Sequence, residues 1–187
     1  METEIKNALE VLWNGGIILY PTDTIWGIGC DATNEAAVKR IYEIKERVDS
    51  KSMLVLIDDA GRIPSYVDEM PEIAWDLIEL ADKPLTIIYP GAKNLAKNLI
   101  AEDKTIGIRV SSEIFTKKLI QRFKKPIVSS SANISGKKSP ANFSEIEEII
   151  KSKVDYVVNY RQDEKKKFEP SGIIQLGVSG EVKIIRE

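Results

Sequence analysis

A run of cationic side chains is the first feature of this sequence that could do chemistry. Five of them lie in a predicted helix and in the loop between it and the buried strand MLVLI: Lys39, Arg40, Lys45, Arg47 and Lys51. Arginine and lysine are the usual protein ligands of phosphate groups, arginine as a planar fork and lysine as a point charge. An exposed helix face would produce the same run, so an anion site and a solvated surface remain open alternatives.

Two predicted strands end in small hydroxyl side chains. LYPTDTIWGIGCDA, residues 19–32, becomes polar at Thr22–Thr24, and PIVSSSANISG, residues 126–136, does the same at Ser129–Ser131. Ligands of open α/β sheets bind beyond the ends of strands. Together with the basic loop, the two strand ends predict one polar pocket, although each could be an ordinary turn. The glycines of GIG, residues 27–29, are expected to bend the chain away from that pocket.

An arginine interrupts the apolar strand IGIRV at position 109. Successive side chains of a strand point to opposite faces, so Arg109 lies on the face opposite Ile108. That face is either solvent or a cleft, because an unpaired arginine is almost never buried.

The composition excludes several classes of enzyme. The chain has no histidine and a single cysteine, Cys30, so Ser-His-Asp and Cys-His sites and an internal disulfide are impossible, and a zinc site lacks its usual ligands. GIGCDA resembles a dinucleotide-binding fingerprint, but six residues separate it from the end of the strand, and no P-loop motif is present. An enzyme of this composition must work through charge, hydroxyl groups and positioning.

Length and hydropathy predict one domain in the cytoplasm. The net charge of the 187 residues is −2, and the apolar runs are shorter than the roughly 18–20 residues that span a membrane. The first residues, METEIKNALE, lack the pattern of a signal peptide. We therefore expect a single domain over residues 1–187 and no membrane partner.

Hydrophobic periodicity predicts helices and strands that alternate along most of the chain. The predicted helices cover residues 5–13, 35–47, 72–81, 114–123 and 144–151. The predicted strands cover residues 17–20, 53–57, 85–89, 106–110, 126–129, 154–160, 171–176 and 182–187. Thr3, Asn34 and a capping box of Ser144 and Glu147 are the expected helix starts. Because strands crowd towards the end, we expect an α/β fold with a mixed sheet and flanking helices.

Five segments, in this order along the chain, resemble the YrdC family, the threonylcarbamoyl-AMP synthases of tRNA modification. They are LYPTDTIWGIGCDA, IKER, TIGIRV, SSSANISG, and EPSGII with the terminal IIRE. The resemblance covers nearly the whole chain. It implies a twisted mixed α/β sheet, the YrdC-like α/β twist, with a concave and positively charged face.

The resemblance also implies a reaction. L-threonine, bicarbonate or CO₂, and ATP would give threonylcarbamoyl-adenylate and pyrophosphate, with Mg²⁺ accompanying ATP and no metal held by the protein itself. The product would pass to a separate transferase complex that modifies N6 of adenosine 37 in tRNA. The tRNA itself is a further candidate partner.

Residues that match the family's motifs acquire expected roles from the resemblance. Its KxR…SxN tetrad, expected to be catalytic, corresponds to Lys45, Arg47, Ser131 and Asn133. The residues expected to bind ATP are Arg47, Lys51, Thr105, Ser131, Ser139 and Arg186. Those expected to bind L-threonine are Thr24, Arg109, Ser129 and Ser171.

Three positions depart from the family's pattern. Ser52 stands where many relatives have proline, Leu56 where some have histidine, and Gly172 where threonine is usual. None of these changes removes a cation. The charged stretch RQDEKKKFEP, residues 161–170, lacks periodicity and is expected to form a mobile loop beside the site.

Two other functions compete with the synthase. An RNA-binding module could use the basic concave face, but the net charge of −2 and an aromatic content of 7% argue against it. Carbamoyl-adenylate chemistry is the second alternative. The YrdC-like domain that performs it in hydrogenase maturation proteins accompanies zinc-finger motifs, which a chain with one cysteine cannot form.

Overall fold

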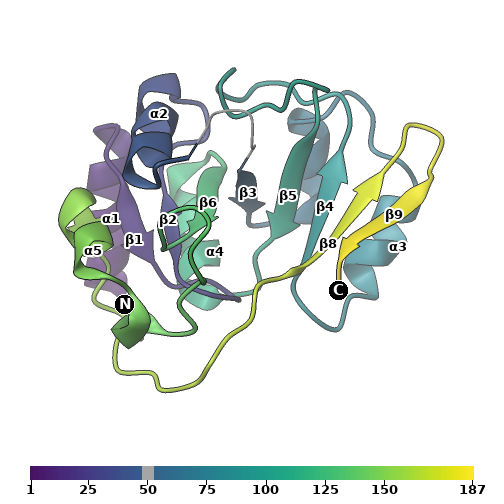
Figure 1. The fold of residues 1–187 in the computed structure, drawn as a ribbon. Helices are drawn as coiled ribbons and strands as arrows, with labels where there is room; N and C mark the ends of the chain where they lie inside the picture. Colours follow the sequence, from purple (N-terminus) through teal and green to yellow (C-terminus); the bar gives the residue numbers. More distant parts are fainter. Residues whose placement is uncertain (48–52) are drawn as a thin grey trace.

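The computed structural model describes residues 1–47 and 53–187, and nine strands of this part form one sheet. Their order is β7-β1-β2-β6-β3-β5-β4-β8-β9 (Figure 1). The strands are β1 (Ile18–Tyr20), β2 (Gly27–Gly29), β3 (Leu54–Ile57), β4 (Leu85–Tyr89), β5 (Ile106–Val110), β6 (Ile127–Ser131), β7 (Tyr156–Val157), β8 (Gly172–Leu176) and β9 (Val182–Arg186). The sheet contains parallel pairs such as β3–β5 and antiparallel pairs such as β4–β5, which confirms the predicted mixed sheet.

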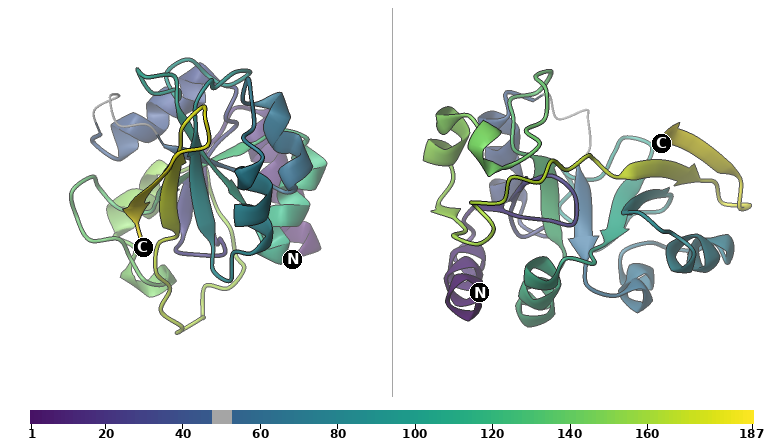
Figure 2. Two further views of the ribbon diagram at one scale, coloured as in Figure 1. Left: turned by 90° about the vertical axis from the view of Figure 1, so that its right-hand side faces the viewer. Right: turned by 90° about the horizontal axis from the view of Figure 1, so that it is seen from below.

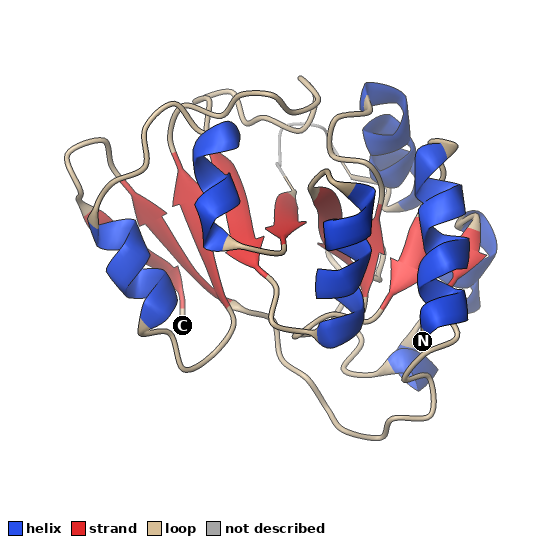
Figure 3. Ribbon diagram, turned by 180° about the vertical axis from the view of Figure 1, so that it is seen from behind, coloured by secondary structure: helices blue, strands red, loops and turns tan. Residues whose placement is uncertain are grey.

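Helices lie on both sides of the sheet, as the front view in Figure 1 and the view from behind in Figure 3 show together. They are α1 (Glu2–Trp13), α2 (Glu35–Ile44), α3 (Ile73–Glu79), α4 (Ile114–Phe123) and α5 (Glu148–Lys153), with two short 3₁₀ segments, η1 (Ala60–Ser65) and η2 (Phe143–Glu145). Helix α1 and strand β9 lie at opposite ends of the sheet (Figure 2). Of the described helices, none is long and apolar enough to cross a bilayer.

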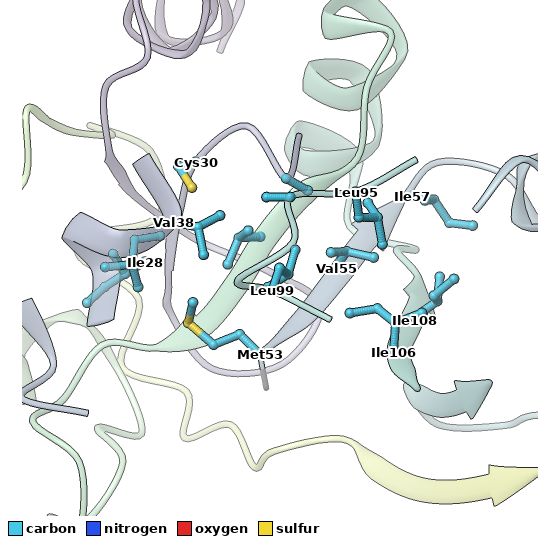
Figure 4. Packing of buried hydrophobic residues seen from close by; sticks show 14 of the residues in the cluster. Ile28, Cys30, Val38, Met53, Val55, Ile57, Leu95, Leu99, Ile106 and Ile108 are labelled. Carbon is cyan, nitrogen blue, oxygen red and sulfur yellow. The ribbon is translucent and has the colours of Figure 1, made fainter. Parts of the chain in front are cut away.

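Alternate side chains of the strands pack into two different hydrophobic clusters. Val55 and Ile108, which face each other across β3 and β5, belong to the larger cluster, which also contains residues of α2 and α3 (Figure 4). Leu56 and Ile127 belong to the second cluster, with α1 and α4. These two helices cover only part of their face of the sheet. The uncovered part carries the polar side chains described below.

Most predicted elements are confirmed, three of them with the predicted bounds: β4, β5 and α4. Asn34 caps α2 as expected, since its side chain accepts a hydrogen bond from the backbone of Ala37 at 3.1 Å. The predicted capping box is wrong. Ser144 lies in η2 and donates to Asn142, and the carboxylate of Glu147 accepts from Lys137 instead. Helix α1 begins at Glu2, so Thr3 lies inside this helix and does not cap it.

The segment GIG is a strand, which corrects the expected flexible turn. It is β2, and it pairs in antiparallel register with β1 and β6. A Cβ atom on Gly29 would lie 2.4 Å from the carbonyl oxygen of Val128 and 2.6 Å from the ring of Tyr20. A Cβ atom on Gly27 would lie 2.9 Å from the hydroxyl of Ser129. These glycines therefore permit close packing against the ring and the serine, where any larger residue would clash.

Candidate active site

A cavity of about 260 Å³ opens on the uncovered part of the sheet. Strands β3, β4, β5, β6, β8 and β9 all contribute to its lining, together with the polar turn after β1. Eight of the residues predicted for the site line this one cavity: Thr24, Arg47, Arg109, Ser129, Ser131, Ser139, Ser171 and Arg186. Segments separated by up to 162 positions, from Thr24 to Arg186, therefore meet as the sequence predicts.

The cavity is cationic and rich in hydroxyl groups. Its charged lining residues are Arg47, Arg109 and Arg186, and the described lining includes no aspartate or glutamate. Burial lowers the pKa of Arg47, and burial together with the charge of Arg109 lowers that of Arg186. Both shifts reflect poor hydration of the guanidinium groups, and Arg186 is in addition repelled by Arg109, a repulsion that an anionic ligand would relieve.

Arg109 is buried, and it is paired with Asp23. The guanidinium Nη2 lies 3.0 Å from Oδ1 of Asp23, and both side chains are at most 4% exposed. Its Nη2 also donates to the hydroxyl of Thr22 at 3.4 Å, while its Nε–H has no hydrogen-bond partner among the described residues. The sequence analysis did not identify Asp23. The acidic residue between the two threonines of PTDT was the available signal, because a buried arginine requires a counter-ion.

The hydroxyl groups are held in place by other hydroxyl groups. Thr22 and Thr24 contact each other through their Oγ1 atoms at 3.1 Å, and Thr22 Oγ1 also accepts from the backbone of Thr24 at 3.0 Å. Across the cavity, Ser171 Oγ lies 2.8 Å from Thr86 Oγ1. The carbonyl oxygen of Ser171 accepts from Nε of Arg186 at 2.9 Å. Thr86 is thus a further site residue that the sequence analysis missed.

Lys45 is not part of the cavity lining, but it contacts the backbone of residues at the site. Its side chain is 1% exposed, and its ammonium donates to the carbonyl oxygens of Ser131 and, at 2.7 Å, Asn133. The backbone carbonyl of Lys45 also accepts from Ser135 at 2.9 Å. The end of α2 is therefore joined to the serine-rich loop after β6. Burial, and secondarily the charge of Arg47, lowers the pKa of Lys45 to about 7.

Two other predicted residues, Asn133 and Thr105, stand apart from the described cavity lining. The amide nitrogen of Asn133 donates to two carbonyl oxygens of its own loop, those of Ile134 and Lys137. Thr105 precedes β5, and its hydroxyl donates to Asp103 at 2.7 Å. Lys51, like Ser52, lies outside the described residues. The structure therefore gathers the arginines and serines in one cavity. The expected roles of all the site residues remain predictions.

The charged stretch 161–170 is attached to the site at two points. Nη1 of Arg161 lies 3.2 Å from the carbonyl oxygen of Thr22, to which it donates, and 3.5 Å from Oε1 of Glu113. Further along, the backbone of Phe168 donates to the carbonyl of Ala141 at 3.0 Å. The stretch has no regular secondary structure and runs in front of the sheet from β7 to β8 (Figure 1). Its mobility remains a prediction.

The arrangement can bind anions and can stabilise charge that develops on them. Guanidinium groups pair with carboxylates and phosphates, and the surrounding hydroxyl groups can both donate and accept hydrogen bonds. The described part of the chain contains no group of three histidine, cysteine or acidic side chains placed to hold a metal ion. The chemistry that fits best is a reaction between negatively charged substrates that need to be held together.

Comparisons with known proteins agree with this geometry. The family model of the Sua5, YciO and YrdC proteins, described as "Telomere recombination", matches residues 10–187. A threonylcarbamoyl-AMP synthase of Pseudoalteromonas translucida (strain TAC 125) is 35% identical over 161 residues, which are 84% of this chain and 86% of that protein.

Solved structures show the same fold. The crystal structure of P. abyssi Sua5 complexed with L-threonine superposes with a TM-score of 0.84 at 27% identity, covering 94% of this chain and 52% of that one. The crystal structure of E. coli YciO gives a TM-score of 0.86 at 25% identity, covering 100% of this chain and 90% of that one. This chain thus spans about half the length of that Sua5 protein.

Proposed function

Because the chain belongs to the Sua5, YciO and YrdC family, we propose that it is a threonylcarbamoyl-AMP synthase. It would convert L-threonine, bicarbonate or CO₂, and ATP into threonylcarbamoyl-adenylate and pyrophosphate. The observation that carries the proposal is the single cavity in which three arginines meet without a described acidic lining residue. Every reactant except CO₂ carries negative charge, and this cavity offers opposing charge from three separate segments of the chain.

Two chemical steps account for the conversion. The threonine amine first loses the proton that its ammonium form carries. The neutral amine then attacks the carbon of CO₂ and releases a second proton to solvent, or attacks bicarbonate and releases water, and forms a carbamate in either case. A carbamate oxygen then attacks the α-phosphorus of ATP, and the bond to the bridging oxygen breaks with release of pyrophosphate. Neither step requires a histidine base, because both depend on positioning and on charge stabilisation.

The site residues divide between the two substrates. We assign the threonine end to Thr24, Ser129, Ser171 and Arg109, a guanidinium group that lines the cavity and can pair with a carboxylate. We assign the adenylate end to four other lining residues, Arg47, Ser131, Ser139 and Arg186. Lys51 and Thr105 are assigned to the same end from their motifs alone. Lys45 and Asn133 complete the catalytic tetrad by fixing the backbone that carries Ser131.

Electrostatics explains why the arginines are needed. Two unit negative charges about 4 Å apart repel each other by roughly 4 kcal/mol at an effective dielectric constant near 20. A carboxylated threonine beside a triphosphate brings several such pairs together. Guanidinium groups that are already desolvated offset this repulsion without reorganising during the reaction.

The proposed reaction also implies a metal ion, an enzyme class and a cellular location. We infer that Mg²⁺ enters bound to the phosphates of ATP, since the described lining offers hydroxyl groups and no carboxylate. The reaction would make the protein a nucleotidyltransferase. We place it in the cytoplasm, where ATP and tRNA are available, as a single domain over residues 1–187 built on one continuous sheet. Its product would be used by a tRNA-modifying transferase.

Threonine-dependent release of pyrophosphate tests the proposal. Arg47→Ala should lower the rate by about 100-fold or more, the usual loss when a group that stabilises developing charge is removed. Lys45→Ala should also lower the rate, because it releases the backbone that carries Ser131. Arg122→Gln is the matched control, because Arg122 pairs with Glu2 on the surface and lies outside the cavity. Circular dichroism must show that the variants are folded. Wild-type rates in both alanine variants would refute the assignment.

A further inference from the structure

The turn after β1 carries a residue of the candidate active site, Thr24, and is held in place by two distant parts of the chain. Thr116 of α4 donates through its hydroxyl to the carbonyl oxygen of Pro21 at 2.9 Å. Arg161 donates through Nη1 to the carbonyl oxygen of Thr22 at 3.2 Å. The turn is therefore fastened to a helix on one side and to the start of the charged stretch on the other.

Thr24 depends on Thr22 for its position. Oγ1 of Thr22 accepts from the backbone N–H of Thr24 at 3.0 Å and lies 3.1 Å from its hydroxyl oxygen. Both side chains are buried, and Thr24 lines the cavity. A displacement of the Thr22 backbone therefore moves a hydroxyl group of the site. Arg161 is absent from the described cavity lining, so its contact with Thr22 is the route by which it reaches Thr24.

The guanidinium group of Arg161 is itself fixed by two carboxylates and an aromatic ring. Its Nε donates to Glu164 at 2.7 Å, and its Nη1 lies 3.5 Å from Oε1 of Glu113, a side chain only 7% exposed. Its central carbon lies 5.0 Å from the centroid of the Phe168 ring, as in a cation–π contact. Together with the hydrogen bond to the turn, these contacts hold the side chain in one position.

The backbone of Arg161 adopts the left-handed conformation, with a φ of 63°. Glycine adopts this conformation more readily than any residue with a Cβ atom, so an arginine at this position strains the backbone. The contacts of its side chain offset that strain. This position allows a sharp test, because Arg161→Gly removes the side chain and relieves the backbone in one step.

We propose that Arg161 is a positioning residue of the active site, which holds the turn after β1 so that Thr24 can bind the amino-acid substrate. The inference rests on the proposed function, which assigns Thr24 to the threonine end of the cavity. The donor to the turn is charged, and charged donors form the stronger hydrogen bonds of proteins. Because ATP is assigned to the other end, loss of Arg161 weakens binding of L-threonine and leaves binding of ATP unchanged.

Amide hydrogen exchange of the free protein tests the positioning without any substrate. The N–H of Thr24 should exchange about tenfold faster in Arg161→Gly than in wild type, since a charge-assisted hydrogen bond of the turn is lost. The N–H of Val128, which donates to the carbonyl of Cys30 in the sheet, should keep its wild-type rate. Unchanged exchange at Thr24 would overturn the proposal. Equally faster exchange at both amides would also overturn it, because the fold as a whole would then have loosened.

Threonine-dependent release of pyrophosphate gives a second readout. Arg161→Gly should raise KM for L-threonine about tenfold and leave KM for ATP within about twofold of wild type. The matched control is Lys165→Gln, which removes one exposed charge from the same stretch and should change neither constant. Equal increases in both KM values would contradict a role confined to the threonine end.

A double-mutant cycle distinguishes positioning from a general structural role. Thr24→Val keeps the shape of the side chain and removes the hydroxyl group, so adding Arg161→Gly to it should weaken threonine binding little further. Losses that multiply would mean that Arg161 acts by another route, and the proposal would fail. A wild-type protein that releases no pyrophosphate with L-threonine would instead refute the synthase assignment, while exchange at Thr24 would still decide whether Arg161 holds the turn.

Discussion

Arg109 and Lys45 are both buried cations of the candidate active site, yet the protein stabilises their charges differently. Arg109 has a carboxylate partner, Asp23, at 3.0 Å. The described partners of Lys45 are backbone carbonyl oxygens, those of Ser131 and Asn133. Carbonyl dipoles satisfy the hydrogen bonds of an ammonium group but do not cancel its charge.

This difference separates a permanent charge from one that can be lost. A guanidinium group keeps its proton at any physiological pH, and the Asp23 carboxylate compensates the desolvation of Arg109. Burial lowers the pKa of Lys45 to about 7, so this side chain can exchange its proton near neutrality. The arginine is suited to holding an anion, whereas the lysine is suited to positioning a loop and responds to pH.

The largest effect on stability is expected from removing the partner of Arg109. Asp23→Asn leaves a buried guanidinium group without a counter-ion, and breaking such a pair costs about 3–5 kcal/mol. Urea unfolding, monitored by tryptophan fluorescence, would measure the loss. Arg109→Met combined with Asp23→Ala should recover part of it, because no uncompensated charge remains. An Asp23→Asn protein as stable as the wild type would show that the pair does not stabilise the fold.

A smaller effect per pH unit is expected from the titration of Lys45. Its pKa falls from the ordinary value of 10.5 to about 7 on folding, so between these values the unfolded chain binds more protons than the folded one. The free energy of unfolding should therefore rise with pH in this window, by up to about 1.4 kcal/mol per pH unit, and level off below pH 7.

The control for this prediction is Lys45→Met, which retains an unbranched side chain of similar length. The difference in free energy of unfolding between wild type and Lys45→Met isolates the lysine, since other titrations cancel. Chemical denaturation at intervals from pH 6 to pH 10 would measure it. Parallel profiles for the two proteins would mean that Lys45 titrates as an ordinary lysine.

The smallest effect is expected from an ion pair on the surface. Arg40 and Asp155 form two hydrogen bonds of 3.0 Å, but their side chains are 43% and 40% exposed. Water and salt screen such a pair, so Arg40→Gln should cost about 1 kcal/mol or less in urea unfolding. If Arg40→Gln lowered the free energy of unfolding as much as Asp23→Asn does, burial could not explain why the two ion pairs differ.

Local pattern predicted most of the fold and missed particular residues for physical reasons. The apolar strands β4 and β5 and the amphipathic helix α4 have the predicted bounds, because hydrophobic periodicity depends on neighbours along the chain. Strand β2 was missed because its two glycines are typical of turns. They are required there by the ring of Tyr20 and by strand β6, and β6 lies about 100 positions further along the chain.

In the candidate site, too, local sequence motifs predicted the residues but not the contacts between distant segments. Motifs along the chain were enough to name eight of the residues that line the cavity. They could not show that Asp23 pairs with Arg109 or that Thr86 meets Ser171, since each contact joins residues separated by more than 80 positions.

The amino-acid sequence by itself determined which chemistry is available to this protein. Without histidine, and with cations and hydroxyl groups at the ends of buried strands, the chain can bind anions but cannot form an imidazole-based site. Only the tertiary structure decided which of these cations act together and in which charge state. Burial and the identity of the nearest partner set the pKa of a side chain, and both arise when distant strands pack into one sheet.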